Sequence, residues 1–405
     1  MKKLVINKTD LRWLCLGLFW ILENLAPHST VSQIAMVIML AGVGIYCVQH
    51  KKIMISPVLI SYSLLILLQF LYVIIGEVAK ESVTINNLET MLICLLCGIV
   101  IYTFLYNAGN IDSVGTFFIY TGIISLVIVM FLCRGSLLTG RMAHAYGEGA
   151  VSYYFLGKPV AISSNGIATY SCFGFFFALI KYAKDKKMRW LLYSGIFIIG
   201  VVLTGSRKGI LMLGAYWAIY EIIIKKNKAL VLKIFGMIVA LILGYMAITK
   251  IPVFRSIIGE RLEDLFLKIF TGATVTEGSM TARARYATYA REIISQEYIF
   301  GKGLGWFKSV YGNVTENNYF ELIVGCGIGG LVLNYSFVIS VLKKLQRFRY
   351  DKMCVAMSLV LAVLLIMEWG SVVYLSRDTL IYESLFFIAV KYANVQKNRN
   401  EVKIN

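Results

Sequence analysis

Residues 88–106 read LETMLICLLCGIVIYTFLY, an apolar run in which Glu89 is the charged residue. A helix needs about 20 predominantly apolar residues to cross the hydrocarbon core of a bilayer, so this run is long enough to span a membrane. Runs of the same kind recur along the chain. They predict twelve transmembrane helices, at about 11–26, 31–48, 55–76, 88–106, 114–133, 162–182, 189–204, 208–224, 229–248, 317–342, 354–375 and 376–392.

The composition supports this interpretation. Of the 405 residues, 59% are hydrophobic and 15% are charged, whereas a soluble domain has about 45–50% and about 25%. We predict an all-α membrane protein in three parts: 1–248 with spans one to nine, an outer catalytic loop at 249–316, and 317–405 with spans ten to twelve and a tail.

The positions of the cationic residues predict the orientation. Cytoplasmic loops collect Lys and Arg, and most of the 40 Lys and Arg residues fall on one side if the N-terminus is cytoplasmic. Both termini are then predicted to be cytoplasmic. The loops at 134–161 and 249–316 are predicted to lie on the outer face.

Cysteine and histidine give no sign of a cofactor. The eight cysteines lie almost wholly in apolar stretches, where a thiol behaves as a small hydrophobe, so we expect no disulfide framework. Cys94 and Cys97 form a C-x-x-C motif inside an apolar run, so we expect their side chains to be lipid-facing or packed and not to bind metal or act in redox chemistry. His28, His50 and His144 have no metal-ligand spacing. We expect neither a metal nor a cofactor.

The long outer loop contains two predicted amphipathic helices. In 254–270 apolar residues recur at helical spacing between charged ones, so this segment should lie on the membrane surface. A second helix is predicted from Ser279 or Thr281 to about Ser295. Arg283 and Arg291 share one face of it, and Arg285 shares another with Tyr289. The position of these arginines outside the membrane is not explained by topology.

Four segments within residues 160–345 form an ordered set: Leu203–Gly209 (LTGSRKG), the arginine helix, Ile299–Gly305 (IFGKGLG), and Glu316–Leu322 (ENNYFEL), which continues to Gly327 and Gly330. Their order and spacing resemble those of the O-antigen ligase and polymerase superfamily, the membrane enzymes called WaaL and Wzy. Lys208 replaces the first Gly of the family's Ser-Arg-Gly-Gly turn, Tyr298 replaces its Pro, and Glu316 replaces the His of its His-Asn-x-Tyr-Leu motif.

The resemblance implies a GT-C-like helix bundle that performs metal-independent glycosyl transfer on the outer face of the bacterial cytoplasmic membrane. The implied donor is an oligosaccharide on undecaprenyl pyrophosphate, and the acceptor is a sugar hydroxyl. A gap-free count back from Gly301 puts the family's loop arginine at Arg283, whereas the arginine-to-aromatic spacing prefers Arg285 with Tyr289. Both residues remain candidates.

The chemistry assigns roles to these residues. A departing pyrophosphate gains negative charge, and the planar guanidinium fork binds phosphate oxygens in pairs. We assign Arg207, with Arg283 or Arg285, to the pyrophosphate. The attacking hydroxyl must lose a proton, and Glu316 is the candidate general base, with partial burial expected to raise its pKa toward the working pH. Further substrate-binding candidates are Arg291, Lys208, Asn317 and Tyr289.

Structural roles compete with these assignments. Arg207 is also suited to anchoring a span end at the headgroups, and the loop arginines to a solvated or lipid-binding face. Glu316 is also suited to capping the next helix, and Asn317 and Asn318 fit capping or hydrogen bonding better than catalysis. The remaining candidates are His28 and His144 as substitute bases, the intramembrane residues Glu23, Glu221, Glu368 and Glu383, and Arg377 as a partner of one of the last two.

Three functions remain open. The leading hypothesis is a polymerase that joins lipid-linked repeat units of a surface polysaccharide such as O-antigen, capsule or exopolysaccharide, alongside a flippase and a chain-length regulator. A ligase would transfer the finished glycan to a lipid or protein acceptor, as in lipopolysaccharide assembly. A flippase or transporter for the same lipid-linked sugar is predicted to show repeats and interrupted spans with polar groups near the midplane. The net charge of +18 reflects topology, so no nucleic acid is expected.

Overall fold

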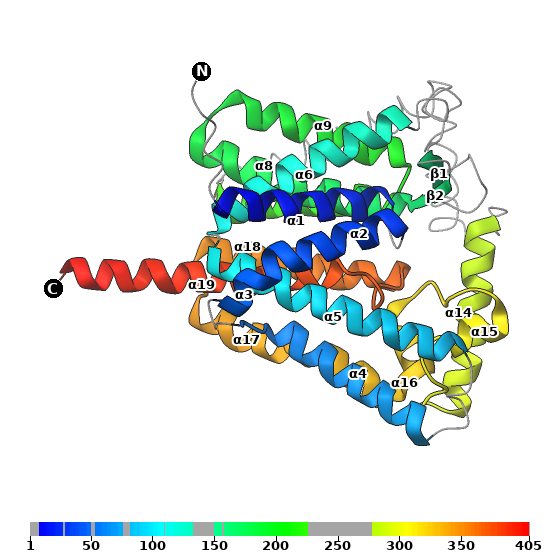
Figure 1. The fold of residues 1–405 in the computed structure, drawn as a ribbon. Helices are drawn as coiled ribbons and strands as arrows, with labels where there is room; N and C mark the ends of the chain where they lie inside the picture. Colours follow the sequence, from blue (N-terminus) through cyan, green and yellow to red (C-terminus); the bar gives the residue numbers. More distant parts are fainter. Residues whose placement is uncertain are drawn as a thin grey trace. The chain divides into compact units, whose positions relative to one another are not determined.

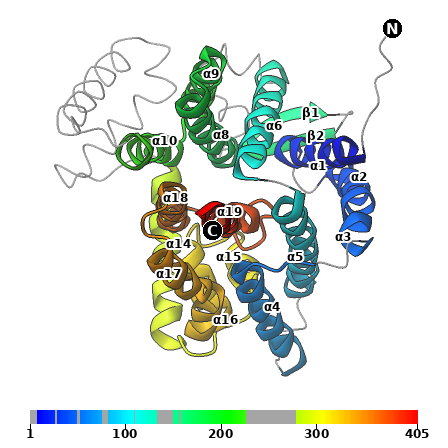
Figure 2. The same cartoon turned by 90° about the vertical axis from the view of Figure 1, so that its left-hand side faces the viewer.

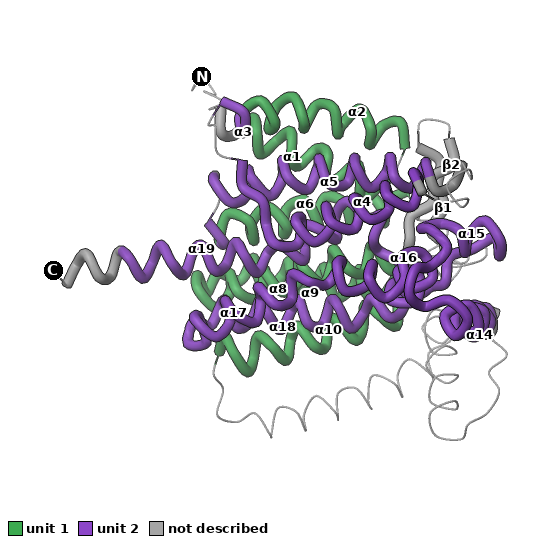
Figure 3. The backbone as a smooth tube through the Cα atoms, turned by 90° about the horizontal axis from the view of Figure 1, so that it is seen from below, with its two compact units in different colours: residues 1–45, 112–277 green, residues 46–111, 278–405 purple. Residues whose placement is uncertain are grey.

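The described chain forms two compact units (Figure 3). In this computed structural model the described residues are 8–26, 29–49, 53–75, 82–108, 110–132, 150–155, 158–225 and 278–404. Unit 1 comprises Met1–Ile45 and Asp112–Glu277, and unit 2 comprises Tyr46–Ile111 and Gly278–Asn405. These units are packing clusters, so they do not test the predicted division at 248 and 316, which stays a prediction.

Helices dominate both units (Figure 1). Those of unit 1 are α1 (Lys8–Leu25), α2 (Thr30–Met39), the π-helical turn η1 (Leu40–Gly44), α6 (Ile111–Leu132), α8 (Ser164–Asp185), α9 (Met188–Thr204), α10 (Arg207–Ile219) and η4 (Tyr220–Ile224). Those of unit 2 are α3 (Ile45–Gln49, which starts at the unit boundary), α4 (Pro57–Ile75), α5 (Ser82–Ala108), α14 (Gly278–Gln296), α15 (Trp306–Tyr311), α16 (Asn318–Tyr335), α17 (Phe337–Arg347), α18 (Lys352–Met367), the 3-10 turn η6 (Glu368–Gly370) and α19 (Thr379–Ile404).

These helices support a multi-pass membrane protein. Seven helical segments of the described chain are long and apolar enough to cross a bilayer, and α9 is apolar but shorter. Twelve spans are not confirmed. The ninth predicted span, 229–248, and the predicted surface helix, 254–270, lie outside the described residues.

Small residues allow close helix packing in unit 1. A Cβ atom on Gly174 of α8 would lie 2.3 Å from the Phe197 ring of α9, and one on Gly200 would lie 2.5 Å from Leu126 of α6. The rings of Phe118 and Phe177 stack 5.7 Å apart between α6 and α8. Close approach of this kind is the usual basis of helix association where lipid removes the hydrophobic driving force.

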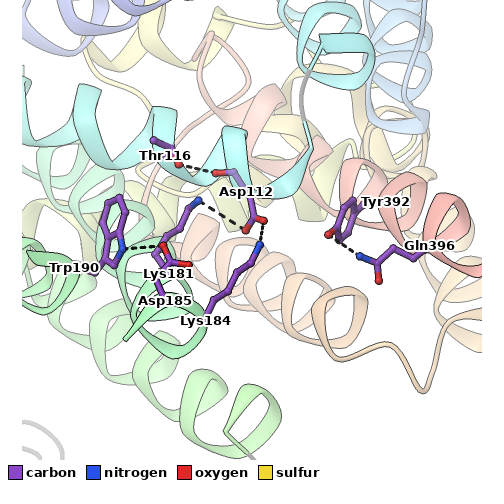
Figure 4. A network of polar contacts seen from close by, with 8 residues as sticks. All are labelled: Asp112, Thr116, Lys181, Lys184, Asp185, Trp190, Tyr392 and Gln396. Carbon is purple, nitrogen blue, oxygen red and sulfur yellow. Dashed lines mark hydrogen bonds and ion pairs between the residues drawn. The ribbon is translucent and has the colours of Figure 1, made fainter. Parts of the chain in front are cut away.

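Polar and charged side chains link the start of α6 to the end of α8 in unit 1 (Figure 4). Asp112, at the start of α6, forms ion pairs with Lys184 and, at 3.9 Å, with Lys181 near the end of α8. Asp185 accepts a hydrogen bond of 3.2 Å from the Trp190 indole. The start of α6 and the end of α8 therefore lie at the same end of unit 1, as the predicted alternation of spans requires.

One β-hairpin departs from the all-α expectation. Strand β1 (Ala150–Phe155) pairs antiparallel with β2 (Lys158–Ser163), with Val151 opposite Ile162. It lies mostly in the segment predicted as the loop 134–161, although the end of β2 falls in the predicted span 162–182, and β2 leads directly into α8. The sequence there is rich in β-branched and aromatic residues, which favour strands.

Helix α19 lies at the centre of unit 2. Figure 2, viewed along the helices, shows α4, α5, α17 and α18 around it. Every side chain from Leu380 to Val390 is buried, including those of Glu383 and Ser384. Most of this stretch is apolar, as expected for a helix that is buried on all sides. The sequence predicted a short twelfth span here. The structure places the same residues in the core of unit 2.

Helix α16 folds back on itself at Gly327, which has a non-helical backbone (φ 65°, ψ −172°). Asn318 and Tyr335 are 17 residues apart, about 25 Å along a straight helix, yet the Asn318 Nδ2 atom lies 2.8 Å from the Tyr335 hydroxyl. The two halves of α16 must therefore turn toward each other. The run predicted as one span at 317–342 is helical but is not one straight helix. We call this bend, with its halves 318–326 and 328–335, the α16 fold-back.

The backbone groups released by the bend bond to the loop at 298–303. Lys302 N donates to Val324 O at 2.7 Å, Gly303 N to Gly325 O at 2.6 Å, and Ile328 N to Tyr298 O at 2.8 Å. A Cβ atom on Gly327 would lie 1.9 Å from the Ile299 carbonyl oxygen. The glycine turn of the third sequence segment thus packs directly on the glycines of the fourth.

We predict that Gly327→Ala destabilises the protein by at least about 2 kcal/mol, because alanine rarely adopts this backbone conformation and its Cβ would meet a carbonyl oxygen. Gly329→Ala is the matched control, since a Cβ on Gly329 meets nothing within 4 Å. Thermal unfolding of both variants in detergent measures the difference. Equal stability of the two would contradict the bend at Gly327.

Candidate functional site: the arginine helix and the start of α16

Helix α14 packs on one face and exposes its arginines on the other. Ala290 and Ile293 are buried against Phe307 of α15 and Val324 of α16. The helix runs from Gly278 to Gln296, so both predicted N-caps, Ser279 and Thr281, lie inside its first turns. The predicted arginines are all exposed: Arg283, Arg285 and Arg291. The apolar face fixes the helix to unit 2 and leaves these guanidinium groups accessible.

The structure distinguishes Arg283 from Arg285. The Arg283 guanidinium forms an ion pair with the Glu316 carboxylate at 3.5 Å between Nη2 and Oε2. The Arg285 guanidinium lies 5.3 Å from the ring of its neighbour Tyr286. The sequence analysis gave Arg283 a phosphate-binding role and Glu316 a proton-accepting role. The structure places these two side chains next to each other in unit 2. Of the two candidates, the arginine that contacts Glu316 is Arg283, which the gap-free count back from Gly301 selected.

Two other candidates contact aromatic rings. Arg291 lies 5.9 Å from the ring of Phe320 in the first turn of α16. Tyr289 stacks on Tyr311 of α15, with 4.8 Å between ring centroids and 20° between planes. Tyr289 therefore has a packing role. Substrate binding by Tyr289 and Arg291 stays a prediction.

Glu316 lies at a strained point of the backbone. Its φ is 60°, and Lys186 is the other described residue besides glycine with a positive φ. A left-handed conformation costs a residue with a Cβ about 1 kcal/mol or more. Its side chain is 31% exposed, and that of Arg283 is 43% exposed. Glu316 is therefore accessible to a ligand from the side of α14.

Asn317, not Glu316, caps α16. Its Oδ1 atom accepts hydrogen bonds from Tyr319 N at 2.9 Å and Phe320 N at 3.2 Å. The capping alternative for Glu316 is therefore wrong, and the capping interpretation of Asn317 is confirmed. Just before the cap, Thr315 N donates to the buried Glu321 carboxylate at 3.0 Å. These bonds fix the backbone on both sides of Glu316.

Arg207 and Lys208 begin α10 in unit 1. Gly205, with a φ of 61°, ends α9, and the Ser206 hydroxyl caps α10 by accepting from Gly209 N at 3.1 Å. The same hydroxyl donates to Asn165 Oδ1 at 2.7 Å. The LTGSRKG segment is thus a tight helix-to-helix turn. The candidates on and near α14 and α16 belong to unit 2, so a site that they share with Arg207 and Lys208 stays a prediction. Glu23 and Glu221 belong to unit 1, and His28 and His144 lie outside the described residues.

A buried polar cluster in unit 2 was not predicted as a set. Asn318 and Glu368 are each 1% exposed, and the Asn318 Nδ2 atom donates to Glu368 Oε2 at 2.9 Å. Tyr335 also donates to Glu368, and Glu383 of α19 is 5% exposed. Glu368 and Glu383 were identified from their place in apolar runs. The sequence gave no reason to group Tyr335 with Asn318, because only the fold-back brings the two side chains together.

Within the described chain, no group of three or more His, Cys, Asp and Glu side chains is arranged to hold a metal ion. A metal-independent reaction stays a prediction. The pairing of Arg377 with Glu368 or Glu383 also stays a prediction. Arg377 is buried in the segment before α19. No protein-family model matches this chain, and no curated protein matches it.

We predict that Arg283→Gln and Glu316→Gln each change the free energy of unfolding by less than about 1 kcal/mol, because partly exposed ion pairs contribute little to stability. Denaturant or thermal unfolding of both variants tests this. A larger loss would mean that the pair has a structural role.

We predict that Asn317→Ala lowers stability by about 1 kcal/mol through the loss of a helix cap, whereas Asn317→Asp retains the cap. The comparison uses the same unfolding assay. Equal destabilisation by the two substitutions would show that the amide nitrogen, not the capping oxygen, matters.

Proposed function

We propose that this protein is a polymerase that joins lipid-linked oligosaccharide repeat units of a bacterial surface polysaccharide by glycosyl transfer. The observation that carries the proposal is the Arg283–Glu316 ion pair, at the start of α16 and beside the exposed Arg285 and Arg291. It joins a phosphate-binding cation to a carboxylate that can accept a proton. The reaction would occur on the outer face of the cytoplasmic membrane.

The donor would be an oligosaccharide on undecaprenyl pyrophosphate. Arg283 and Arg285, with Arg207 from unit 1, would bind its diphosphate, since guanidinium groups bind phosphate oxygens in pairs and retain their charge. Preorganised cations stabilise the charge that develops on a leaving group, commonly by about 3 kcal/mol for one group. The exposed arginine face of α14 provides such cations near the bundle.

The acceptor would be a sugar hydroxyl. As its oxygen attacks the anomeric carbon, the hydroxyl proton passes to the Glu316 carboxylate and the bond from that carbon to the phosphate oxygen breaks. The lipid pyrophosphate leaves with the bonding electron pair. A single displacement of this kind inverts the anomeric configuration. Binding of a diphosphate by Arg283 would separate its guanidinium from Glu316 and expose the carboxylate to the acceptor.

Two alternatives remain. A ligase with the same site would transfer a finished glycan to a lipid or protein acceptor. A transporter is favoured by two observations that sequence did not reveal together: α16 is interrupted at Gly327, and Glu368 and Glu383 are buried beside it. Interrupted helices and buried ionisable groups are common in transporters. The arginine helix, which has too much charge to span, favours the polymerase.

We predict that purified protein in vesicles lengthens lipid-linked repeat units into a ladder of products on a gel. Glu316→Gln and Arg283→Gln should each lower the rate by about 10² or more, since each removes a group that acts in the transition state. Arg349→Gln is the matched control, because Arg349 is an exposed arginine beside Tyr350 on the turn after α17.

The outcomes separate the three functions. Transfer of a preformed glycan to an acceptor without lengthening would indicate the ligase. Movement of the donor across the bilayer without any new glycosidic bond would indicate the transporter. A ladder that forms normally with Glu316→Gln would remove Glu316 from the mechanism.

A further inference from the structure

The loop that bonds to the α16 fold-back turns three large side chains outward. Tyr298, Ile299 and Phe300 are 54%, 52% and 69% exposed. We call these three residues the apolar tip. Their backbone is bonded to membrane-spanning helices on both sides, because Ile328 N of α16 donates to Tyr298 O at 2.8 Å and the Tyr72 hydroxyl of α4 donates to Phe300 O. Contiguous apolar side chains left open on a protein surface usually mark a contact with lipid, a ligand or another protein.

Helix α4 shows how deep the apolar tip and the turn after it lie. The candidate membrane span of α4 ends at Ile74, and Tyr72, which bonds to the tip, lies two residues before that end. Leu304 N donates to the Gln69 Oε1 atom at 3.3 Å, and Gln69 lies about 7 Å of helix rise before Ile74. The chain from the tip to Leu304 is therefore level with the last turns of the span and within the thickness of the membrane.

The helices beside the apolar tip are also apolar and exposed on their outer sides. The second half of α16 exposes Ile328 and Val332, one turn apart, and Ile328 bonds directly to Tyr298. Along α4 the exposed side chains recur every three or four residues, at Ile60, Leu64, Leu67, Leu71 and Ile74. Such a stripe is expected where one face of a span is in contact with lipid. The apolar tip therefore continues the lipid-facing surface of unit 2.

The residues around the apolar tip are suited to the boundary between lipid and water. Glu297 and Lys302 lie on either side of the tip and form an ion pair with each other. At a membrane boundary apolar and aromatic side chains enter the lipid while charged groups stay among the headgroups. Non-helical backbone at this depth is tolerated only where protein satisfies its polar groups. Here Lys302 N and Gly303 N donate to carbonyl groups of α16.

We propose that Tyr298, Ile299 and Phe300 insert into the bilayer where the headgroups meet the acyl chains, and so form a membrane-contact surface of unit 2. This contact goes beyond the proposed function and does not depend on it. The tip follows directly after α14, which runs across the ends of α4 and α16 (Figure 1). Insertion of the tip holds the C-terminal end of α14 at the membrane surface, so that the arginines of α14 lie near the lipid phosphates.

Photo-crosslinking in vesicles tests this contact without any activity assay. The full-length protein carries Phe300→p-benzoylphenylalanine, is reconstituted in vesicles of phosphatidylglycerol and phosphatidylcholine, and is irradiated before mass spectrometry. Phe300 is exposed and its replacement retains a phenyl ring, so the variant should unfold at the wild-type temperature. It should form lipid adducts. The same replacement at Ile299 should also form them, which keeps the test open if one variant fails to fold.

Two exposed positions of unit 2 are matched controls. Ile74 lies on the lipid-facing stripe of α4, and Thr288 lies on the face of α14 opposite the buried Ala290. The yield of lipid adducts at Phe300 should equal that at Ile74 and exceed that at Thr288 several-fold. A yield at Phe300 and Ile299 as low as that at Thr288, with strong labelling at Ile74, would overturn the proposal. Crosslinks from the tip to a second copy of the chain, in place of lipid, would also overturn it and indicate an interface between copies.

Discussion

The rest of unit 2 depends on one constraint: backbone groups released inside an apolar bundle must find partners. A break in a helix within a membrane protein is tolerated only where protein groups replace the lost bonds. At Gly327 the loop at 298–303 supplies those partners through three backbone hydrogen bonds. The loop therefore supplies partners at the bend itself, and Asn318, Tyr335 and Glu368 hydrogen-bond the two halves of α16 to each other and to η6.

The amino-acid sequence predicted the parts of the fold that depend on local pattern. The apolar runs at 55–76 and 114–133 became α4 and α6 within a few residues, since length and hydropathy alone decide whether a helix is apolar enough to span. The second helix of the long loop was also predicted, although α14 begins at Gly278 and includes the residues expected to cap it. Whether a segment forms a helix depends mainly on its own residues. The residue at which the helix begins depends also on tertiary contacts, which the sequence pattern does not show.

The parts that were missed depend on contacts between distant residues. Nothing in the spacing of Gly327 and Gly330 distinguishes a smooth helix from a fold-back, because glycine permits both. Arg283 and Arg285 were equally suitable by sequence, and only the position of Glu316 separates them. Likewise, Glu316 and Asn317 were both candidate caps, and the positive φ of Glu316 excludes it from that role. The two strands of the hairpin were not predicted, because most of their residues lie in the segment 134–161, which was predicted to be a loop.

The central place of α19 has a consequence for biosynthesis. Unit 2 is built from two stretches of chain, and the whole of Asp112–Glu277 is translated between them. All other helices of unit 2 leave the ribosome before α19, yet α19 fills the space among α4, α5, α17 and α18. Until α19 is made, those helices lack the element around which they pack. The packing of unit 2 can therefore be completed only after residues from Thr379 onward have been translated.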